Sequence, residues 1–406
     1  VDEAVMPQAV QILPPRAAVF TNLFRDQLDR FGEVDTVSIR WQQAIELLPE
    51  NTTLILNADD PSTAHLSEFF HGQVVFFGID DASFNLANDG VASERHQVMD
   101  TRTCPHCGGE YTYTVQYYSH LGHYTCSQCM RERPEADVRA VKIVVDGIDR
   151  LRIRVESRTQ QGEIVIPLAG FYNVYNALAA IAASQALGIS WEPIVSGIEQ
   201  FKPAFGRGER VHVQGRTLRL LLAKNPTGFN EVLRTLFSDG IRRHVLFVLN
   251  DNIADGQDIS WIWDVDFERT THLLATLTVA GTRAFDLALR LKYAGIEQEA
   301  MAIVTSAPLR ALKVTHESNA RHKRQHRQVR NKKMMRKTQL DGLDESTMNH
   351  GSTKTYGTSQ ALDSAIRQTP SGETLFVIPT YTGLLEIHRE LEHRGLTPRY
   401  WEERGP

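Results

Sequence analysis

The sequence predicts an α/β fold built from two units, with a small metal-binding insert in the first. Three observations lead to this prediction: short apolar runs alternate with helix-like segments over the first hundred residues, two closely spaced pairs of cysteines follow, and further apolar runs begin beyond residue 207. Buried strands of a parallel sheet are short, nearly continuous apolar runs, and helices connect them. We therefore expect one such sheet in each unit.

Composition sets outer limits on function. The chain has 406 residues, of which 42% are hydrophobic and 23% charged, as in two or three globular domains with their own cores. A formal net charge of −5 gives no general attraction to nucleic acid or to an anionic membrane. The sequence has no apolar run of about 18 residues that could cross a bilayer. The first residues lack the basic start and apolar stretch of a signal peptide, so we expect a cytoplasmic protein.

Three apolar runs in the first unit are candidate strands. They span residues 17–20, 54–56 and 74–77, and polar or glycine residues follow each run. Ligands of parallel sheets bind outside the carboxyl ends of the strands. Asn22 and Asp26 follow the first run and are therefore candidate ligand-binding residues. Helix capping and surface charge are the alternative.

Four cysteines give the sharpest local signal. Cys104 and Cys107 form one Cys-x2-Cys pair, Cys126 and Cys129 form the other, and the chain has no further cysteine. Two such pairs at this spacing make a tetrahedral thiolate cage, so we predict a zinc ribbon inserted over residues 101–135. Four thiolates leave no open position, which makes the ion structural, and iron is the alternative metal. Two disulfides would not suit a large chain that has no secretory segment.

Five tyrosines lie between the cysteine pairs. Aromatic side chains in such a place can stack on nucleic-acid bases, but more often they supply the core that a small metal-held ribbon lacks. We favour the core. The residues are Tyr111, Tyr113, Tyr117, Tyr118 and Tyr124.

A strand pair and a helix are predicted after the ribbon. Residues 141–145 and 151–155 have the pattern of two strands around a turn, and the alanine-rich stretch 177–187 favours a helix. Asn173 and Asn176 are one turn apart at the start of this helix, where both amides can face a ligand. Capping and simple solvent exposure are the alternative.

A stretch that contains Pro and two Gly, residues 201–210, indicates the boundary between two domains. We place the domains at 1–206 and 207–406. Strands in the second domain are predicted over residues 218–222, 245–249 and 375–378.

An unusual segment runs from Asp251 to Glu268, directly after the strand at 245–249. It combines several carboxylates with Trp261 and Trp263. A loop with only a connecting role does not need so many charged and large apolar residues together, so we favour a functional role for this segment.

One later segment differs in composition from the rest. Residues 316–337 contain nine Lys or Arg, three His and one acidic residue, and residues 346–359 are rich in Ser, Thr and Gly. We predict a disordered basic insert over about 316–358. Such an arm can contact nucleic acid or anionic lipid, and a solvated loop without function is the alternative.

Several motifs in this order resemble the Mur ligase superfamily and, within it, the MurT family of synthetase subunits. They are residues 21–33 (TNLFRDQLDRFGE), 57–61 (NADDP), the four-cysteine ribbon, 172–180 (YNVYNALAA), 223–226 (AKNP) and 251–268. They cover most of residues 1–300, and the resemblance resumes at Leu375. It implies a Mur ligase-like central domain that carries the ribbon, followed by a C-terminal α/β domain.

The resemblance also implies a reaction. MurT-like proteins activate the α-carboxylate of D-glutamate in the lipid II stem peptide with ATP, and ammonia displaces phosphate from the acyl phosphate to leave D-isoglutamine. A separate glutaminase subunit of the GatD type supplies the ammonia. The implied cofactors are ATP, Mg²⁺ and structural zinc, and the implied place of action is the inner face of the cell membrane. No nucleic-acid partner is expected.

Nucleotide-binding roles follow position by position. Asn173 and Asn176 match asparagines that Mur ligases place near the adenine, and Arg207 matches an arginine that reaches the nucleotide from the domain junction. Asn22 and Asp26 lie at the strand end that serves the metal and the phosphates.

Two positions in these motifs depart from the common pattern. Gln27 replaces a histidine that follows the aspartate in most Mur ligases. Lys224 stands where many of them have a histidine after a ribose-binding aspartate, and Leu221 occupies that aspartate's position.

Asp258 is implied to act on another chain. In MurT-like proteins this aspartate completes the Cys-His pair of the glutaminase, as the acid of a triad shared between two chains. Asp255 is the rival, three residues away. The structural alternative is that Asp258 caps a helix beginning near Ser260.

One expected motif does not occur. Mur ligases carry a Gly-x-x-Gly-Lys-Thr-like P-loop before the region that opens this chain, and this sequence has none. We therefore expect a chain that is incomplete at its N-terminus and weak in ATP turnover.

Two other functions stay open. A zinc-ribbon module that binds nucleic acid through the basic arm is disfavoured by the acidic pI of about 6.3. Another Mur-type amino-acid ligase, similar to folylpolyglutamate synthase, would explain Asn173 and Asn176 but neither the ribbon nor the Asp258 segment.

Overall fold

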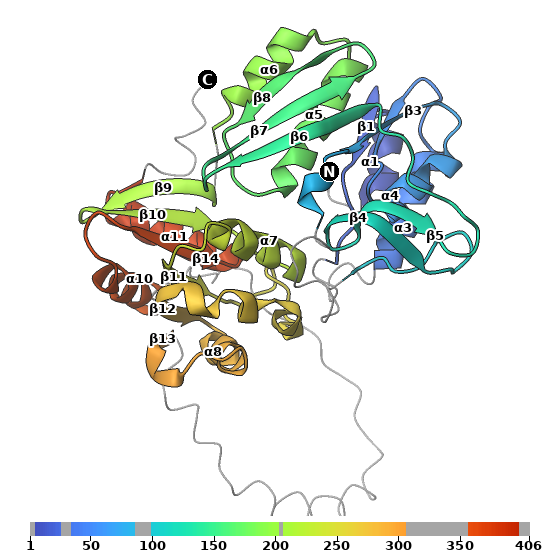
Figure 1. The fold of residues 1–406 in the computed structure, drawn as a ribbon. Coiled ribbons are helices and arrows are strands. Elements are labelled where there is room, and N and C mark those ends of the chain that lie inside the picture. Colours follow the sequence, from blue (N-terminus) through green and yellow to red (C-terminus); the bar gives the residue numbers. More distant parts are fainter. Residues whose placement is uncertain (1–4, 26–33, 86–98, 203–205, 306–355, 398–406) are drawn as a thin grey trace, which may run out of the picture.

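The computed structural model describes residues 5–25, 34–85, 99–202, 206–305 and 356–397. The described residues form two α/β units, a first unit up to residue 202 and a second unit from residue 206 (Figure 1). Each unit contains one six-stranded sheet, and a separate two-stranded hairpin lies beside the first. This arrangement confirms the predicted α/β class.

The first sheet is parallel over four strands and antiparallel at one edge. Its spatial order is β1 (Ala17–Phe20), β2 (Thr53–Asn57), β3 (Gln73–Ile79), β6 (Val138–Asp146), β7 (Arg150–Ser157) and β8 (Gln161–Ile166). Strands β1 to β3 and β6 pair in parallel, whereas β6, β7 and β8 form an antiparallel meander. All the first-unit strands predicted from apolar runs are present, and the edge strand β8 was not predicted.

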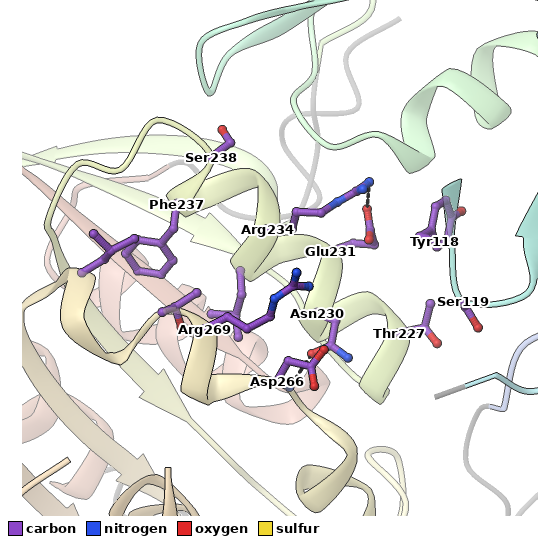
Figure 2. Close-up of a pocket in the computed structure, with 13 residues that line it drawn as sticks. Tyr118, Ser119, Thr227, Asn230, Glu231, Arg234, Phe237, Ser238, Asp266 and Arg269 are labelled. Atoms are coloured by element: carbon purple, nitrogen blue, oxygen red, sulfur yellow. Dashed lines mark hydrogen bonds and ion pairs between the residues drawn. The ribbon is translucent and has the colours of Figure 1, made fainter. Parts of the chain in front are cut away.

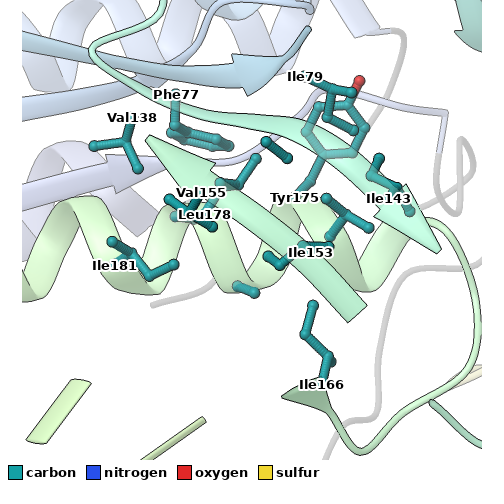
Figure 3. Close-up of a cluster of buried hydrophobic side chains, with 14 of the residues drawn as sticks. Phe77, Ile79, Val138, Ile143, Ile153, Val155, Ile166, Tyr175, Leu178 and Ile181 are labelled. Atoms are coloured by element: carbon teal, nitrogen blue, oxygen red, sulfur yellow. The ribbon is translucent and has the colours of Figure 1, made fainter. Parts of the chain in front are cut away.

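Helices cover both faces of this sheet. They are α1 (Met6–Ile12), α3 (Val34–Glu46), α4 (Pro61–His65), α5 (Tyr172–Ala186) and α6 (Trp191–Glu199), with short 3-10 turns η2 (Leu66–Phe69) and η3 (Ala82–Phe84). Strand β2 shows how the layers form: Ile55 packs in the α5 core, and Leu54 and Leu56 pack on the opposite face with α1 and α3. Figure 3 shows α5 lying beneath the sheet, with Leu178 and Ile181 facing it.

The cysteine-bearing hairpin is an insert in the first sheet. Strands β4 (Tyr111–Tyr118) and β5 (Leu121–Cys126) pair with each other, and β3 pairs directly with β6 across the insert. Tyr117 and Tyr118 leave the hairpin and are buried in the core of the first unit. Within the hairpin, Tyr124 is buried and packs against Tyr111 and Tyr113, as predicted for the core of the ribbon, whereas Tyr117 and Tyr118 belong to the core of the first unit.

The second sheet is parallel except at one edge. Its spatial order is β13 (Met301–Thr305), β12 (Leu274–Gly281), β11 (Arg243–Val248), β14 (Thr374–Pro379), β10 (Arg216–Leu221) and β9 (Arg207–Val213), the last pairing antiparallel with β10.

Two helices lie on each face of the second sheet. One face packs on α7 (Pro226–Phe237) and α8 (Ala284–Tyr293), the other on α10 (Tyr356–Gln368) and α11 (Tyr381–His393). The 3-10 turns of this unit are η5 (Ser260–Asp264), η6 (Phe267–Arg269), η7 (Thr271–Leu273) and η8 (Gln298–Ala300). No helix in the described ranges is long and apolar enough to cross a membrane.

Two boundaries differ from the predictions. The stretch 201–210 was interpreted as linker, but β9 already begins at Arg207, because Val211 and Val213 are buried against the second sheet. Residues 356–358, placed in the disordered insert, belong to helix α10. The rest of that insert, including 316–337, lies outside the described residues.

Arginines connect the two units at three places. Arg219 of β10 donates to the carboxylate of Asp149 (2.6 Å) and to the carbonyl oxygen of Ile148 (3.0 Å), at the tip of the β6–β7 hairpin. Arg234 of α7 donates to the carbonyl oxygen of Tyr117 (3.2 Å). Arg210 of β9 also pairs with Asp149. The third place, at Arg25, belongs to the candidate site.

Candidate functional site

The loop after β11 carries the acidic segment singled out in the sequence. Asp251 lies near its start and pairs with Arg283 at the N-terminal end of α8 (2.6 Å). Asn250 donates to Thr382 (3.0 Å) and Glu386 (3.1 Å) of α11. The loop is thus anchored at its start to two helices of the second unit, at the carboxyl end of the sheet.

Asp255 is fully engaged inside this loop. Its side chain is buried, and its carboxylate accepts the backbone N–H of Thr382 (2.7 Å), the Thr382 hydroxyl and the backbone N–H of Asn252 (3.2 Å). Burial raises the pKa of Asp255. This carboxylate therefore has a structural role in closing the loop onto α11.

Asp258 differs from Asp255 in each of these respects. It is exposed, and its carboxylate accepts the backbone N–H of Ser260 (2.8 Å), at the start of η5. This hydrogen bond lowers the pKa of Asp258, so the group stays ionised at neutral pH. The alternative interpretation, that Asp258 caps a helix near Ser260, is only partly met: Asp258 accepts the backbone N–H of Ser260, but the N-cap position of η5 is Ile259. This hydrogen bond leaves the carboxylate accessible from solvent.

A pocket separates this loop from the first unit. Its walls include Lys224, Asp258 and Trp261 of the second unit and Arg25 of the first. The structure thus brings two predicted site residues, Lys224 and Asp258, to one pocket, which Asp255 also lines.

Arg25 is a site residue that the sequence analysis did not single out. It lies in the motif after β1, and its guanidinium bridges Asp100 (2.5 Å), at the start of the insert, and Asp264 (3.2 Å) of η5. Its backbone N–H also donates to Asp100. Its place within the TNLFRD motif was the one available signal, because its two carboxylate partners are distant in sequence.

The strand-end residues are held in place by a buried aspartate. Asn22 is half-buried directly after β1, and the neighbouring backbone N–H of Leu23 donates to Asp60 (2.7 Å). Asp60 also accepts the backbone N–H groups of Ser62 (2.9 Å) and Thr63 (3.2 Å) at the start of α4. Asp26 and Gln27 lie outside the described residues.

Asp59, in the same NADDP motif, is a second buried acid. Its carboxylate accepts the Nε–H of Arg133 (2.5 Å), the hydroxyl of Tyr175 (2.7 Å) and the backbone N–H of Ile79 (2.9 Å). Arg133 follows the last cysteine, so this ion pair links the insert to the carboxyl end of β2.

The two helix-start asparagines lie one turn apart on α5, as predicted. The Asn173 amide donates to the carbonyl oxygen of Ala169 (2.6 Å), and the Asn176 amide donates to the Asn173 oxygen (3.1 Å). Asn173 is buried and closes the turn that precedes the helix, while Asn176 is exposed. Asn173 therefore has a structural role, and Asn176 is the more accessible of the two.

The start of α5 faces the second unit across a narrow pocket. Gly170 and Tyr172 line one side, and Arg219 and Leu221 of β10 line the other. Leu221 thus lies on the wall at the position where the resemblance places a ribose-binding aspartate in relatives. The backbone of Arg207 begins β9, and its side chain lies outside the described part of the chain.

The four cysteine sulfurs form one cluster. All four atoms lie within 4.8 Å of one another, with 3.7 Å between Cys104 and Cys129 and 3.4 Å between Cys107 and Cys126. A disulfide bond is about 2.05 Å long, so the four thiols are free. Tetrahedral zinc with Zn–S bonds of about 2.3 Å needs sulfurs roughly 3.8 Å apart, and the donor set fits that ion.

The two knuckles share one backbone geometry. The backbone N–H of Gly108 donates to the Cys104 carbonyl (2.8 Å), and that of Met130 donates to the Cys126 carbonyl (3.2 Å). Both residues have positive φ, 76° and 58° respectively, which turns the chain back around the sulfurs. The insert is therefore built as a pair of matching metal knuckles.

A larger pocket lies between the hairpin and α7 (Figure 2). Glu231 is buried beside it and pairs with Arg234 (2.7 Å), and Tyr118 and Arg269 lie on opposite walls. Burial raises the pKa of Glu231, although the Arg234 charge opposes this shift. No pattern in the sequence pointed to this pocket, because its residues come from three distant segments.

Two family profiles match the chain. The Mur ligase middle domain matches residues 3–124, and the MurT ligase C-terminal domain matches residues 222–326. The first match covers β1 to β3 and most of the hairpin, and the second covers the loop that carries Asp255 and Asp258.

Curated relatives match over most of the chain. The lipid II isoglutaminyl synthase (glutamine-hydrolyzing) subunit MurT of Streptococcus pneumoniae is 33% identical over 323 residues, which are 79% of this chain and 69% of the relative. The subunit of the same name from Staphylococcus aureus is 34% identical over 300 residues, 73% of this chain and 64% of the relative. The chain thus spans about two thirds of the length of these relatives.

Solved structures share the fold at lower identity. A pseudomurein peptide ligase type C from Methanothermus fervidus has a TM-score of 0.64 at 20% identity, over 96% of this chain and 65% of that one. MurF ligase from Thermotoga maritima in complex with ADP has a TM-score of 0.53 at 11% identity, over 96% and 65% of the two chains. With the two profile matches and the pneumococcal relative, these findings mean that the chain belongs to the MurT family of Mur ligases.

Proposed function

We propose that the chain is the synthetase subunit of a glutamine-dependent amidotransferase that acts on lipid II. Its reaction would convert the α-carboxylate of D-glutamate in the stem peptide to an amide, with consumption of ATP. Family membership and the printed function of the MurT relatives support this proposal. The single observation that carries it is the exposed, ionised Asp258 at the mouth of a pocket shared by both units.

The chemistry requires two steps. A carboxylate is a poor electrophile, so transfer of the terminal phosphoryl group of ATP to a carboxylate oxygen first gives an acyl phosphate. Ammonia then attacks the acyl carbon, the C–O bond to phosphate breaks, and the amide and inorganic phosphate are released. Positioning and charge neutralisation are what a protein contributes to such a reaction.

Asp258 is proposed to serve the ammonia-producing step on a partner subunit. In a Cys-His-Asp arrangement, the acid accepts a hydrogen bond from the histidine and orients it toward the thiol. An exposed carboxylate with a lowered pKa suits that task. Asp255 does not, because three hydrogen bonds from its own chain already occupy its oxygens. A GatD-like glutaminase that docks on this loop is therefore the proposed partner.

Nucleotide binding is proposed at the junction of the two units. Asn176 would contact the base, and Asn22, Asp26, Arg207 and Lys224 would serve the phosphates and Mg²⁺. Among these, Asn22 and Lys224 lie at or near the carboxyl ends of strands, where ligands of α/β sheets bind. Asn173 is proposed to support Asn176 rather than to contact the nucleotide.

Zinc is the proposed ion of the cysteine cluster, with a structural role. Elemental analysis of the purified chain should find one zinc per chain, and a Cys104→Ser, Cys107→Ser double variant should lose it. One iron per chain would contradict the assignment, as would an ion retained by the double variant.

The place of action is proposed to be the inner face of the cell membrane, because lipid II is membrane-anchored. A nucleic-acid-binding function is not favoured, since the tyrosines that could stack on bases are largely buried in the hairpin and the first unit.

Oxygen-18 transfer tests the proposed reaction directly. Lipid II labelled with ¹⁸O in the D-glutamate α-carboxylate is incubated with the chain, its glutaminase partner, ATP and glutamine. The acyl phosphate route predicts one ¹⁸O in the inorganic phosphate for each amide formed. Amide formation with unlabelled phosphate would contradict the route, and no amide from a folded complex would contradict the function.

A further inference from the structure

The contact between Arg25 and Asp264 joins the two ends of the proposed enzyme. Arg25 lies five residues after the end of β1, in the segment proposed to serve the nucleotide, and Asp264 lies six residues after Asp258. Both side chains line the pocket that also contains Asp258. A single guanidinium therefore touches both the synthetase side and the loop that carries the proposed triad acid.

Arg25 is itself held firmly on the side of the first unit. Asp100 accepts both its backbone N–H (3.1 Å) and its Nε–H (2.5 Å), and the Asp100 side chain has no solvent exposure. The Arg25 side chain is 30% exposed, and its Nη2 donates to Asp264 (3.2 Å). The Arg25 guanidinium is thus held by Asp100 in the first unit and contacts Asp264 in the second.

The loop is anchored at its start, along η5 and at its end. Contacts of Asp251 and Asp255 fix its start, and Asn230 of α7 fixes its end by accepting the backbone N–H of Asp266 (2.8 Å). Within η5, Ile262 is buried and its carbonyl oxygen accepts from Arg290 (3.2 Å), and the Asn230 amide donates to the Asp264 carbonyl oxygen (3.3 Å). The section before η5 is exposed at Gln257 and Asp258, and the hydrogen bond from Ser260 to Asp258 is internal to it. The Arg25–Asp264 ion pair is the contact from the other unit that reaches the loop beside this section.

We propose that Arg25 is a positioning residue, which holds the Asp258 loop in place from the first unit and so makes the loop depend on the arrangement of the two units. This inference rests on the proposed function for the role of Asp258. The physical basis is a partly exposed ion pair between the two units, which holds η5 directly after the exposed section that carries Asp258.

Hydrogen exchange of the loop amides tests the contact in the chain by itself. Asp264→Asn removes the charge while keeping the shape, and Asp264→Glu retains the carboxylate. Asp239→Asn is the matched control, because Asp239 is similarly exposed and pairs with Arg243 of its own unit. We expect Asp264→Asn to raise exchange of residues 256–263 about two- to fivefold, the range for an ion pair of this exposure, and both other variants to leave it near wild type.

A kinetic readout tests the consequence for the complex with its glutaminase. Misplacement of a catalytic group by about 1 Å can cost up to 100-fold in rate, so we expect Asp264→Asn to lower kcat for glutamine hydrolysis about fivefold with KM unchanged, and Asp264→Glu to restore it. Arg25→Lys, which keeps the charge but loses the two-sided fork, should give an intermediate rate.

Two results would overturn the inference: wild-type exchange in the loop of the Asp264→Asn variant, or unchanged kcat in its complex. Neither coincides with failure of the proposed function. That failure would be seen as glutamine hydrolysis that survives Asp258→Asn, and the exchange measurement needs no partner subunit.

Discussion

The two units place aspartates at equivalent positions and use them differently. Asp59 and Asp60 follow β2 of the first sheet, and Asp255 and Asp258 follow β11 of the second. In the first unit both carboxylates have no solvent exposure and are saturated by donors from the chain. In the second unit one carboxylate is buried and the other is exposed. Position at a strand end therefore does not identify a functional acid, whereas exposure together with unused oxygen lone pairs does.

The buried acids do have an indirect connection to the site. Asp60 anchors Leu23, directly beside Asn22, and Asp59 ties Arg133 of the insert to β2 and β3. They hold the strand end and the insert together, so that Arg25 can reach from Asp100 to the second unit. Asp59 and Asp60 thus stabilise the fold of the first unit, whereas Asp258 is exposed on the second unit and accessible to a partner.

Removal of Asp59 should have the largest effect on stability. Asp59→Ala leaves Arg133 buried without its closest carboxylate and the Tyr175 hydroxyl without an acceptor, which should cost about 3–5 kcal/mol in the free energy of unfolding. Urea denaturation measures this loss. Asp80→Ala is the matched control, since Asp80 pairs with the same arginine but is 25% exposed, and it should cost about 1 kcal/mol or less. Equal losses of unfolding free energy in the two variants would contradict the distinction between buried structural aspartates and exposed ones.

The two capping aspartates should differ by a smaller amount. Asp60 is buried and caps α4 through several donors, whereas Asp258 is exposed and accepts one backbone N–H at the start of η5. Asp60→Ala should therefore lower the free energy of unfolding by about 2 kcal/mol, and Asp258→Ala should lower it by only about 0.5 kcal/mol. Thermal unfolding of both variants side by side checks this. A larger loss of stability for Asp258→Ala would mean that its hydrogen bond to Ser260, and not an accessible carboxylate, accounts for an aspartate at this position.

The smallest expected effect concerns the pH dependence of Asp255. Burial raises its folded-state pKa above the ordinary value of 3.8, so the folded protein holds this proton to higher pH than the unfolded chain does. Its contribution to stability is therefore present below about pH 3.8 and is lost as pH rises through the folded pKa. Relative to Asp255→Asn, the wild type should therefore lose stability over that range. A parallel pH profile for the two proteins would argue against a buried, structural Asp255.

Much of the fold could be predicted because local patterns carry it. The apolar runs at 17–20, 54–56 and 74–77 are strands of a buried sheet, and the cysteine spacing predicts the cluster. The edge strands β8 and β9 escaped prediction, because only one face of each is buried. Only Val211 and Val213 mark β9, beside glycines that favoured a linker.

The site was less predictable because it depends on contacts between distant segments. Spacing alone could not choose between Asp255 and Asp258, since their difference comes from Thr382, which is 127 residues from Asp255. In the same way, Arg25 gains its place from Asp100 and Asp264, 75 and 239 residues away. Asn173 and Asn176 share a helix turn as predicted, but only burial shows that Asn173 serves the protein's own backbone.

Glutamine hydrolysis by the complex of the Asp258→Asn chain with its glutaminase tests the central claim most directly. The account predicts a loss of about a thousandfold or more in kcat, with the complex intact and the free energy of unfolding within about 0.5 kcal/mol of wild type. A wild-type rate, or a larger loss for Asp255→Asn than for Asp258→Asn, would contradict it.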